Sequence, residues 1–283
     1  MSQFEPRSFI VDRGGFALAG ETVGEGPPIV LAHGLTATRR YVVHGSRVLP
    51  RSGFETITYD ARGHGESDPA PPNAGYAYPE LIDDLAALLD ELGVGACMLA
   101  GHSMGAHTLA GLALADQARI AALVLIEPAY DGEEPGEQVL ARWDRLADGL
   151  EQGGVEGFIA AYDEGLDPAS RETLIRIARE RLSLHRHPEA VARALRETPR
   201  SRPFEALSEL QGIDVPALVV ASHDEVDASH PYAVGAAWSS QLPQARLVSE
   251  EPGESPLAWQ GGRLSREIVA FCEEPQVAQR LAA

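Results

Sequence analysis

The sequence predicts an α/β fold with a mostly parallel sheet that carries helices on both faces. Short apolar runs alternate with helical patterns through the first half of the chain, and the alternation returns near its end. Runs that are apolar throughout, such as residues 28–32 and 120–126, are typical of strands buried on both faces. A chain of 283 residues is long enough for one large domain or for a domain with an insertion.

The first half of the chain contains most of the predicted sheet. Two short strands around the turn at residues 13–15 predict a hairpin over residues 8–23. Apolar residues recur at helical spacing over residues 81–92, and this helix ends at Gly93. The remaining elements follow the alternation, with strands at 28–32, 55–59, 96–100 and 120–126 and a helix at 103–115.

The alternation stops between Tyr130 and Pro203. Short charged helices are predicted there, over residues 139–150, 155–162, 170–184 and 188–197. The sheet pattern returns with strands at 216–220 and 245–248, a helix from Pro231 and a closing helix at 263–271. We therefore expect an α/β core formed by residues 1–129 and 204–283 and a helical cap formed by residues 130–203. Such a cap would cover the C-terminal edge of the sheet, where open α/β sheets place their sites.

The charged residues of the predicted cap are expected to form a solvated face. Leu174, Ile177, Ala178 and Leu182 recur at helical spacing and would form the buried stripe of one cap helix. Arg181 and His185 are assigned to the solvated face.

The composition excludes several classes of function. The formal net charge of −19 argues against nucleic acid and against anionic membranes as partners. All 23 basic residues are arginine, and a chain without lysine cannot use a Schiff base. Cys97 and Cys272 lie in apolar surroundings, and no cysteine and histidine spacing indicates a metal site. We expect no cofactor and no metal.

The chain is expected to act in the cytoplasm on a small-molecule substrate. Its first residues lack the basic and apolar segments of a signal peptide, and no apolar stretch is long enough to span a bilayer. The sequence does not indicate an oligomeric state.

Residues 101–105 read Gly-His-Ser-Met-Gly between a predicted strand and a predicted helix. This Gly-x-Ser-x-Gly pattern is the nucleophile elbow, a sharp turn that lifts the serine hydroxyl clear of the sheet. Glycine is needed on both sides because a Cβ would clash with the neighbouring strand and helix. Ser103 is therefore the candidate nucleophile, and it needs a base within hydrogen-bond reach.

Several segments in this order resemble the α/β-hydrolase superfamily: His33-Gly34-Leu35, Tyr59-Asp60-Ala61-Arg62-Gly63-His64-Gly65-Glu66-Ser67, the segment Gly101–Gly105, and the strand at Pro216. The resemblance covers nearly the whole chain outside the cap and implies the fold of that superfamily. It also implies that the backbone N–H groups of Leu35 and Met104 form an oxyanion hole. It places an acid in the loop after the Pro216 strand and a histidine base near the C-terminus.

The acid is expected in the loop that begins at Ser222. Counting from the strand selects Glu225, whereas counting back from Pro231 selects Asp227. We prefer Asp227, because the turn into the following helix fixes the geometry more tightly than the strand end does. Two more carboxylates could serve instead: Asp224 in the same loop, and Glu127 at the position that some dehalogenase-like relatives use.

The position of the base contains no histidine. Relatives carry Gly-His there, whereas this chain has Gly253-Glu254. We therefore expect Glu254 to be the general base of a Ser-Glu-Asp site, because burial and the charge of Asp227 would raise its pKa. Three histidines elsewhere in the chain are alternative bases: His107, His223 and His230. Two further histidines, His33 and His102, are expected to hold turns together.

Two classes of function follow from this site. The first is a cofactor-free enzyme that acts on a small, largely apolar ester, lactone or thioester through Ser103. The second is a non-hydrolytic protein on the same fold: a lyase, a cyclase, an acyl-transfer enzyme or a ligand-binding protein. Losing one essential triad member costs about a million-fold in a peptidase with a full triad. Either Glu254 has taken over proton transfer, or the function has changed.

Overall fold

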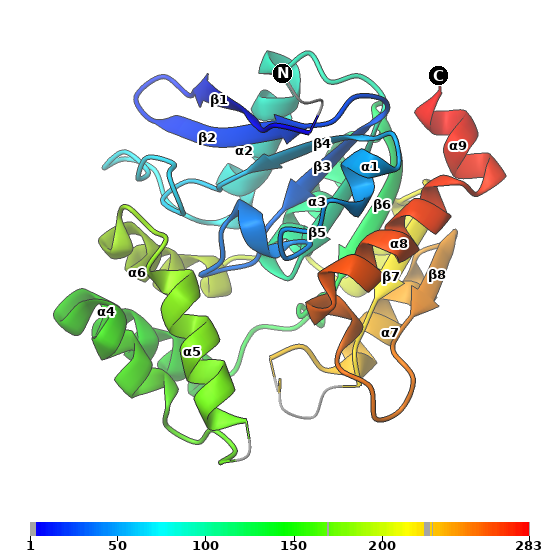
Figure 1. Cartoon of the computed structure of the whole chain (residues 1–283). Helices are drawn as coiled ribbons and strands as arrows, with labels where there is room; N and C mark the ends of the chain where they lie inside the picture. Colours follow the sequence, from blue (N-terminus) through cyan, green and yellow to red (C-terminus); the bar gives the residue numbers. More distant parts are fainter. Residues whose placement is uncertain (1–3, 169, 224–226, 228, 283) are drawn as a thin grey trace.

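The computed structural model describes residues 4–168, 170–223, 227 and 229–282, which form an eight-stranded sheet with helices on both faces (Figure 1). The strand order is β1-β2-β4-β3-β5-β6-β7-β8. The strands are β1 (Arg7–Asp12), β2 (Ala17–Val23), β3 (Pro28–Ala32), β4 (Glu55–Tyr59), β5 (Cys97–His102), β6 (Ile120–Ile126), β7 (Ala217–Val220) and β8 (Ala245–Val248). Strands β1 and β2 form the antiparallel hairpin, β2 also pairs antiparallel with β4, and the six strands β3 through β8 run parallel to one another. The predicted α/β fold is confirmed.

Helices cover both faces of the sheet, and alternate strand residues meet each layer. The core helices are α1 (Val48–Arg51), α2 (Tyr78–Glu91), α3 (Met104–Ala115), α7 (Tyr232–Gln241), α8 (Gly261–Cys272) and α9 (Pro275–Leu281). On β3, Val30 packs with the layer of α2, α3 and α7, whereas Ile29 and Leu31 pack with that of α1, α8 and α9. In the described ranges no helix combines the length and the apolar character needed to cross a bilayer.

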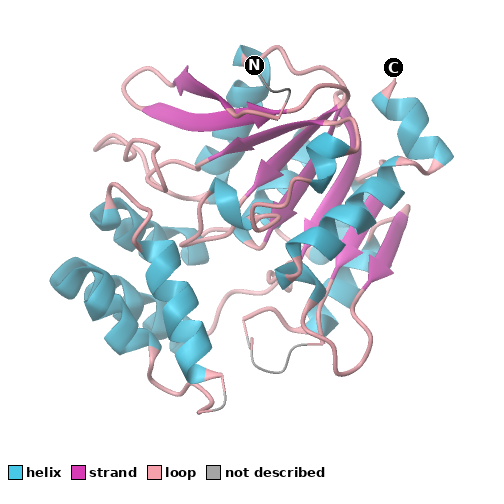
Figure 2. Cartoon of the chain, viewed as in Figure 1, coloured by secondary structure: helices cyan, strands magenta, loops and turns pink. Residues whose placement is uncertain are grey.

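Three further helices follow β6 and lie outside both layers (Figure 2): α4 (Glu137–Tyr162), α5 (Arg171–Leu182) and α6 (Pro188–Glu197). They share an apolar cluster of their own, which includes Leu146, Phe158 and Leu195. The two helices expected over 139–162 are joined as α4 but are kinked at Gly154, whose φ of 60° and ψ of −148° are non-helical. The division into core and cap at residues 130 and 203 stays a prediction.

Candidate active site

Ser103 lies at a sharp turn between β5 and α3. Its φ of 52° and ψ of −114° fall outside the helix that starts at Met104. A Cβ at Gly101 would lie 2.6 Å from the backbone of Gly105, and a Cβ at Gly105 would lie 2.2 Å from the carbonyl oxygen of Ala32. Both glycines are therefore required for β3, β5 and α3 to approach this closely.

The hydroxyl of Ser103 contacts an imidazole. Ser103 Oγ lies 2.8 Å from His230 Nε2, and His230 Nδ1 lies 2.7 Å from Asp227 Oδ2. A carboxylate only accepts hydrogen bonds, so Nδ1 carries the proton and donates it to Asp227. Nε2 is then free to accept the hydrogen bond of the Ser103 hydroxyl. The three side chains form a serine–histidine–carboxylate chain, the arrangement that activates a hydroxyl for attack.

One short turn carries both the carboxylate and the imidazole. Asp227 Oδ1 accepts the backbone N–H of Ser229 at 3.0 Å, and the Asp227 carbonyl accepts the N–H of His230 at 3.2 Å. Pro231 follows with a φ of −62°, and α7 begins at Tyr232. Because His230 comes three residues after Asp227, this turn brings the imidazole back onto the carboxylate.

The charges around His230 suit it to be a base. Burial by itself lowers the pKa of His230, but the hydrogen bond and charge of Asp227 outweigh burial and raise the pKa above its ordinary value. Burial by itself raises the pKa of Asp227, but the hydrogen bond from His230 brings that pKa well below its usual range. Asp227 is therefore ionised, and the proton taken from Ser103 would be held on His230.

Glu254 has a different environment from the one expected, and its assignment as the base is wrong. Its side chain is exposed and accepts hydrogen bonds from Arg263 and from the backbone N–H of Glu251. The bond from Arg263 lowers the pKa of Glu254, whereas a base would need a raised one. The physical reason is the absence of the two causes invoked for it: Glu254 is neither buried nor placed against Asp227, which instead bonds His230.

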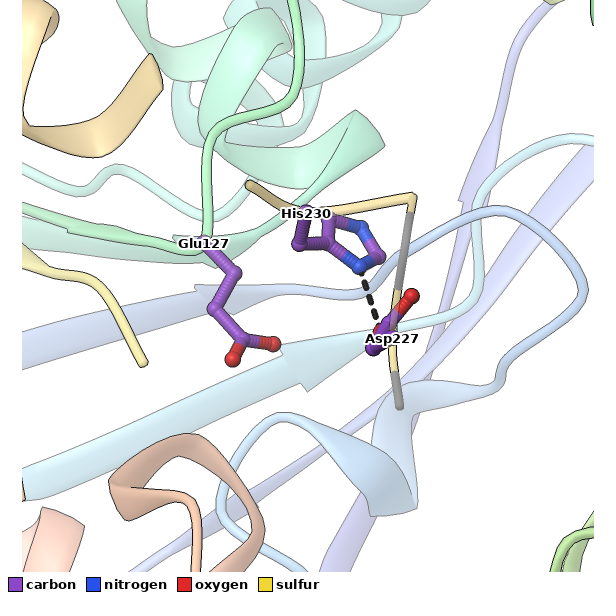
Figure 3. Close-up of side chains that lie close together, drawn as sticks. All are labelled: Glu127, Asp227 and His230. Carbon is purple, nitrogen blue, oxygen red and sulfur yellow. Dashed lines mark hydrogen bonds and ion pairs between the residues drawn. The ribbon is translucent and has the colours of Figure 1, made fainter. Parts of the chain in front are cut away.

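Glu127 is a second carboxylate beside His230, and Figure 3 shows it directed toward the space that Asp227 and His230 share. It is 3% exposed, and its φ of 47° is held by a 2.7 Å hydrogen bond from its backbone N–H to the carbonyl of Val220. Its Oε2 lies 3.0 Å from His102 Nε2. Burial raises the pKa of Glu127, but the His102 bond outweighs burial and lowers it. Glu127 therefore adds negative charge near His230 without bonding to it.

Glu127, Asp227 and His230 each offer an oxygen or nitrogen atom within 4.8 Å of the others, a spacing that could suit a metal ion. Both ring nitrogens of His230 are already engaged, one by Asp227 and one by Ser103. A metal ion would need the lone pair of one of these ring nitrogens, so the geometry fits proton transfer better than metal binding.

The two N–H groups expected to form an oxyanion hole belong to residues next to the serine or next to its neighbour: Met104 follows Ser103, and Leu35 follows Gly34, where a Cβ would lie 3.4 Å from Ser103 Cβ. Met104 is the first residue of α3, where the N–H has no partner within the helix. Within the described part of the chain, neither Leu35 nor Met104 donates its N–H to a protein acceptor. The side chain of Leu35 packs against the core cluster and against the cluster that α4, α5 and α6, the predicted cap, share. The loop after β3 therefore lies at the boundary between the core and these helices, which we call the seam. Neither N–H is therefore engaged by the described part of the protein, as an oxyanion hole would require.

The buried histidines act as structural groups. His107 Nε2 accepts the N–H groups of Ala129 and Tyr130, and burial lowers the pKa of His107 to about 3. His33 Nδ1 donates to the carbonyl of Gly34 while Nε2 accepts from Ala61, and burial lowers its pKa to about 3. Both rings are therefore neutral. The ring nitrogens of His107 are engaged by Tyr78, Ala129 and Tyr130, so His107 lacks the contact with Ser103 Oγ that a base needs.

The loop between β7 and α7 carries three more residues that the sequence offers as acid or base. His223 is exposed and its ring stacks on Tyr232 at 3.8 Å, so the imidazole that contacts Ser103 is that of His230 and not that of His223. Asp224 and Glu225 lie outside the described residues.

The expectation that Arg181 and His185 lie on a solvated face is also wrong. His185 is buried, where Nε2 donates to the carbonyl of Thr36 and Nδ1 accepts the N–H of Gly65. The Arg181 Nε is buried as well. His185 is buried because the stretch after α5 packs against the loops that follow β3 and β4.

Comparison with known proteins agrees with this architecture. A sequence model of the family described as "alpha/beta hydrolase fold" matches residues 27–261. The chain belongs to this family. Relatives that carry hydrolase names support an enzyme of the hydrolase type.

Individual relatives show how far the likeness extends. The "Putative carbamate hydrolase RutD" of Agrobacterium fabrum is 30% identical over 234 residues, which cover 82% of this chain and 87% of that protein. The "Putative non-heme haloperoxidase" of Mycobacterium phage D29 is 34% identical over 138 residues, which cover 49% of this chain and 49% of that protein. This match therefore spans about half the length of that relative. A thermophilic esterase from Thermogutta terrifontis superimposes with a TM-score of 0.77 and 24% identity, covering 94% of this chain and 97% of the esterase. That likeness concerns the fold alone.

Proposed function

We propose that this protein is a serine hydrolase in which Ser103, His230 and Asp227 form the catalytic triad. The observation that carries the proposal is the pair of short contacts on one imidazole, 2.8 Å to Ser103 and 2.7 Å to Asp227. The elbow geometry at Ser103 and the two available N–H groups support it. The hydrolase name of a relative that aligns with 82% of the chain agrees with it.

The reaction proposed here is hydrolysis of a small ester, lactone or thioester. Ser103 Oγ attacks the carbonyl carbon while His230 Nε2 takes the hydroxyl proton, and Asp227 stabilises the imidazolium. The N–H groups of Leu35 and Met104 bind the oxyanion at the positive end of α3. The tetrahedral intermediate collapses, and His230 gives its proton to the leaving oxygen or sulfur. Water, deprotonated by His230, then attacks the acyl-enzyme. The bond between Ser103 Oγ and the acyl carbon breaks, the acid leaves, and His230 returns the proton to Ser103 Oγ.

The non-hydrolytic alternative depended on the absence of a histidine base. His230 removes that reason, so no separate candidate function is favoured. A small-molecule substrate and a cytoplasmic location stay predictions of the sequence.

The acyl-enzyme provides a direct test of the proposed function. We expect 4-nitrophenyl acetate to give a burst of 4-nitrophenolate close to one equivalent, and rapid quenching to leave an acetyl group on the peptide that contains Ser103. Ser103→Ala should abolish both the burst and the adduct. Turnover of the ester with no adduct on Ser103, or with Ser103→Ala fully active, would exclude the mechanism.

Glu127 gives a prediction about pH dependence. Neutral His230 is the active form, so kcat/KM rises with pH through the pKa of His230, which lies above the ordinary value. The charge of Glu127 contributes to this raised pKa. We expect Glu127→Gln to move the rise in kcat/KM to lower pH, because the imidazolium loses a stabilising charge, while the plateau at high pH changes little. Steady-state pH profiles of wild type and Glu127→Gln measure this shift, and a rise displaced to higher pH would contradict it.

A further inference from the structure

Arg181 on α5 is a partly buried cation without a carboxylate partner. Its Nε is inaccessible to solvent and makes no hydrogen bond, and no ion pair of Arg181 occurs among the described residues. Every other described arginine that is at least partly buried pairs with a carboxylate, as Arg39 does with Asp60 and Arg62 with Asp84. In a chain of net charge −19 carboxylates are abundant, so the missing partner needs a reason.

The charge of Arg181 lies close enough to the catalytic groups to act on them. Its charge acts on Tyr41 in the loop after β3, on Tyr162 at the end of α4, and on Asp227. It also opposes protonation of His230. Tyr41 belongs to the core, Tyr162 to α4, and Asp227 to the turn whose His230 contacts Ser103. Figure 1 shows α5 on the side of the cap that faces α7 and α8.

Burying the Nε of Arg181 without a hydrogen bond is unfavourable for the free protein. Burial lowers the pKa of Arg181, yet a guanidinium keeps its proton even in buried sites. Buried charges in proteins are normally paired, because an unpaired one loses its hydration without compensation. No described carboxylate is paired with Arg181, so removal of this side chain would deprive none of them of a partner. A structural role as one half of an ion pair is therefore absent, whereas an anion in the seam would compensate the charge.

The chemistry of that anion follows from its surroundings. The planar fork of a guanidinium matches a carboxylate with two parallel hydrogen bonds. Asp227 and Glu127 already place negative charge beside His230, since both have lowered pKa values. A singly charged carboxylate is thus favoured over a doubly charged phosphate.

We propose that Arg181 binds a carboxylate of the substrate, so that the preferred substrates are small esters, lactones or thioesters that carry an additional anionic carboxylate. This inference rests on the proposed function and narrows its substrate class from largely apolar to anionic compounds. The bound carboxylate would pair with Arg181 across the seam while the scissile carbonyl lies at Ser103.

Matched substrate pairs test this specificity. Mono-4-nitrophenyl glutarate and 4-nitrophenyl pentanoate differ only in a terminal carboxylate or methyl group on the acyl side. The 4-acetoxybutanoate anion and butyl acetate differ in the same way on the alcohol side. For at least one pair we expect wild type to prefer the anion by on the order of 10-fold or more in kcat/KM, as charge-assisted hydrogen bonds allow.

The preference should depend on Arg181 alone. Arg181→Met keeps the length of the side chain and should lower kcat/KM for the anionic ester by on the order of 10- to 100-fold. The neutral ester should change little, and Arg181→Lys should fall between the two because it keeps the charge without the fork. Arg176→Met is the matched control, since Arg176 is exposed on the same helix and pairs with Glu180. All rates are compared on the high-pH plateau, because Arg181 itself acts on the pKa of His230.

The outcomes separate this inference from the proposed function. Acylation of Ser103 together with equal rates for both members of each pair, or with a preference that survives in Arg181→Met, would overturn the carboxylate site and leave the hydrolase intact. Absence of any Ser103 acylation would overturn the hydrolase. In that case calorimetric titration with glutarate decides: binding to wild type that Arg181→Met abolishes supports the site, and no binding to wild type overturns it.

Discussion

Replacement of His230 by alanine is expected to lower kcat/KM for ester hydrolysis by about a million-fold, the effect of removing an essential triad base. His230 is the imidazole that contacts Ser103 Oγ, and without it the hydroxyl proton has no acceptor there. The N–H groups of Leu35 and Met104 would remain and should leave a residual rate about a thousand-fold over water. Steady-state kinetics with a 4-nitrophenyl ester measures the loss, and thermal unfolding checks that the variant is folded.

His223→Ala is the matched control for this prediction. His223 precedes the same turn, but its ring is exposed and stacks on Tyr232. Its removal should leave kcat/KM nearly unchanged. Added imidazole should partly restore His230→Ala, because a free imidazole can occupy the space beside Ser103. A His230→Ala variant that keeps more than about a tenth of wild-type kcat/KM would show that another group accepts the proton, since general-base catalysis contributes at least 100-fold.

Asp227→Asn is expected to lower kcat by about ten-thousand-fold, the effect seen when a triad carboxylate becomes an amide. The amide can donate a hydrogen bond to His230 Nδ1 and so favour the tautomer in which Nε2 carries a proton toward Ser103. Loss of the charge should also lower the pKa of His230, since Asp227 is the main group that raises it. The rise in activity with pH should therefore move to lower pH as kcat falls.

Glu127→Gln serves as the comparison for the acid. Glu127 bonds His102 rather than His230, so its effect on kcat should be far smaller than that of Asp227→Asn. A large loss with Glu127→Gln and a small one with Asp227→Asn would reverse the roles and make Glu127 the orienting acid.

Most of the fold was predictable because its signals are local. The apolar runs at 28–32 and 120–126 become β3 and β6, and the helix expected at 188–197 is α6. Two helices were expected over 139–150 and 155–162, and the structure joins them as α4 with a kink at Gly154. The final helix α9 was not predicted from the sequence.

The site was predictable only where a motif fixes the backbone. Glycines on both sides identify Ser103, and the turn into α7 identifies Asp227. The base was assigned to Glu254 from its position in the chain, which assumes that the histidine follows the last strand. The spacing of Asp227 and His230 was the overlooked signal, because residues three apart can meet within one turn. Arg181 carried a similar signal: it follows Ile177 and Ala178 by four and three residues, which places it beside the buried stripe of α5.

The rate at which a fluorophosphonate modifies Ser103, read by mass spectrometry, tests the assignment of the base most directly. Measured side by side, His230→Ala should lose modification by at least about a hundredfold, the contribution of a general base. Glu254→Gln should react at the wild-type rate, because the Glu254 side chain is exposed and bonds Arg263. Modification that persists in His230→Ala but fails in Glu254→Gln would contradict a histidine base and restore the carboxylate.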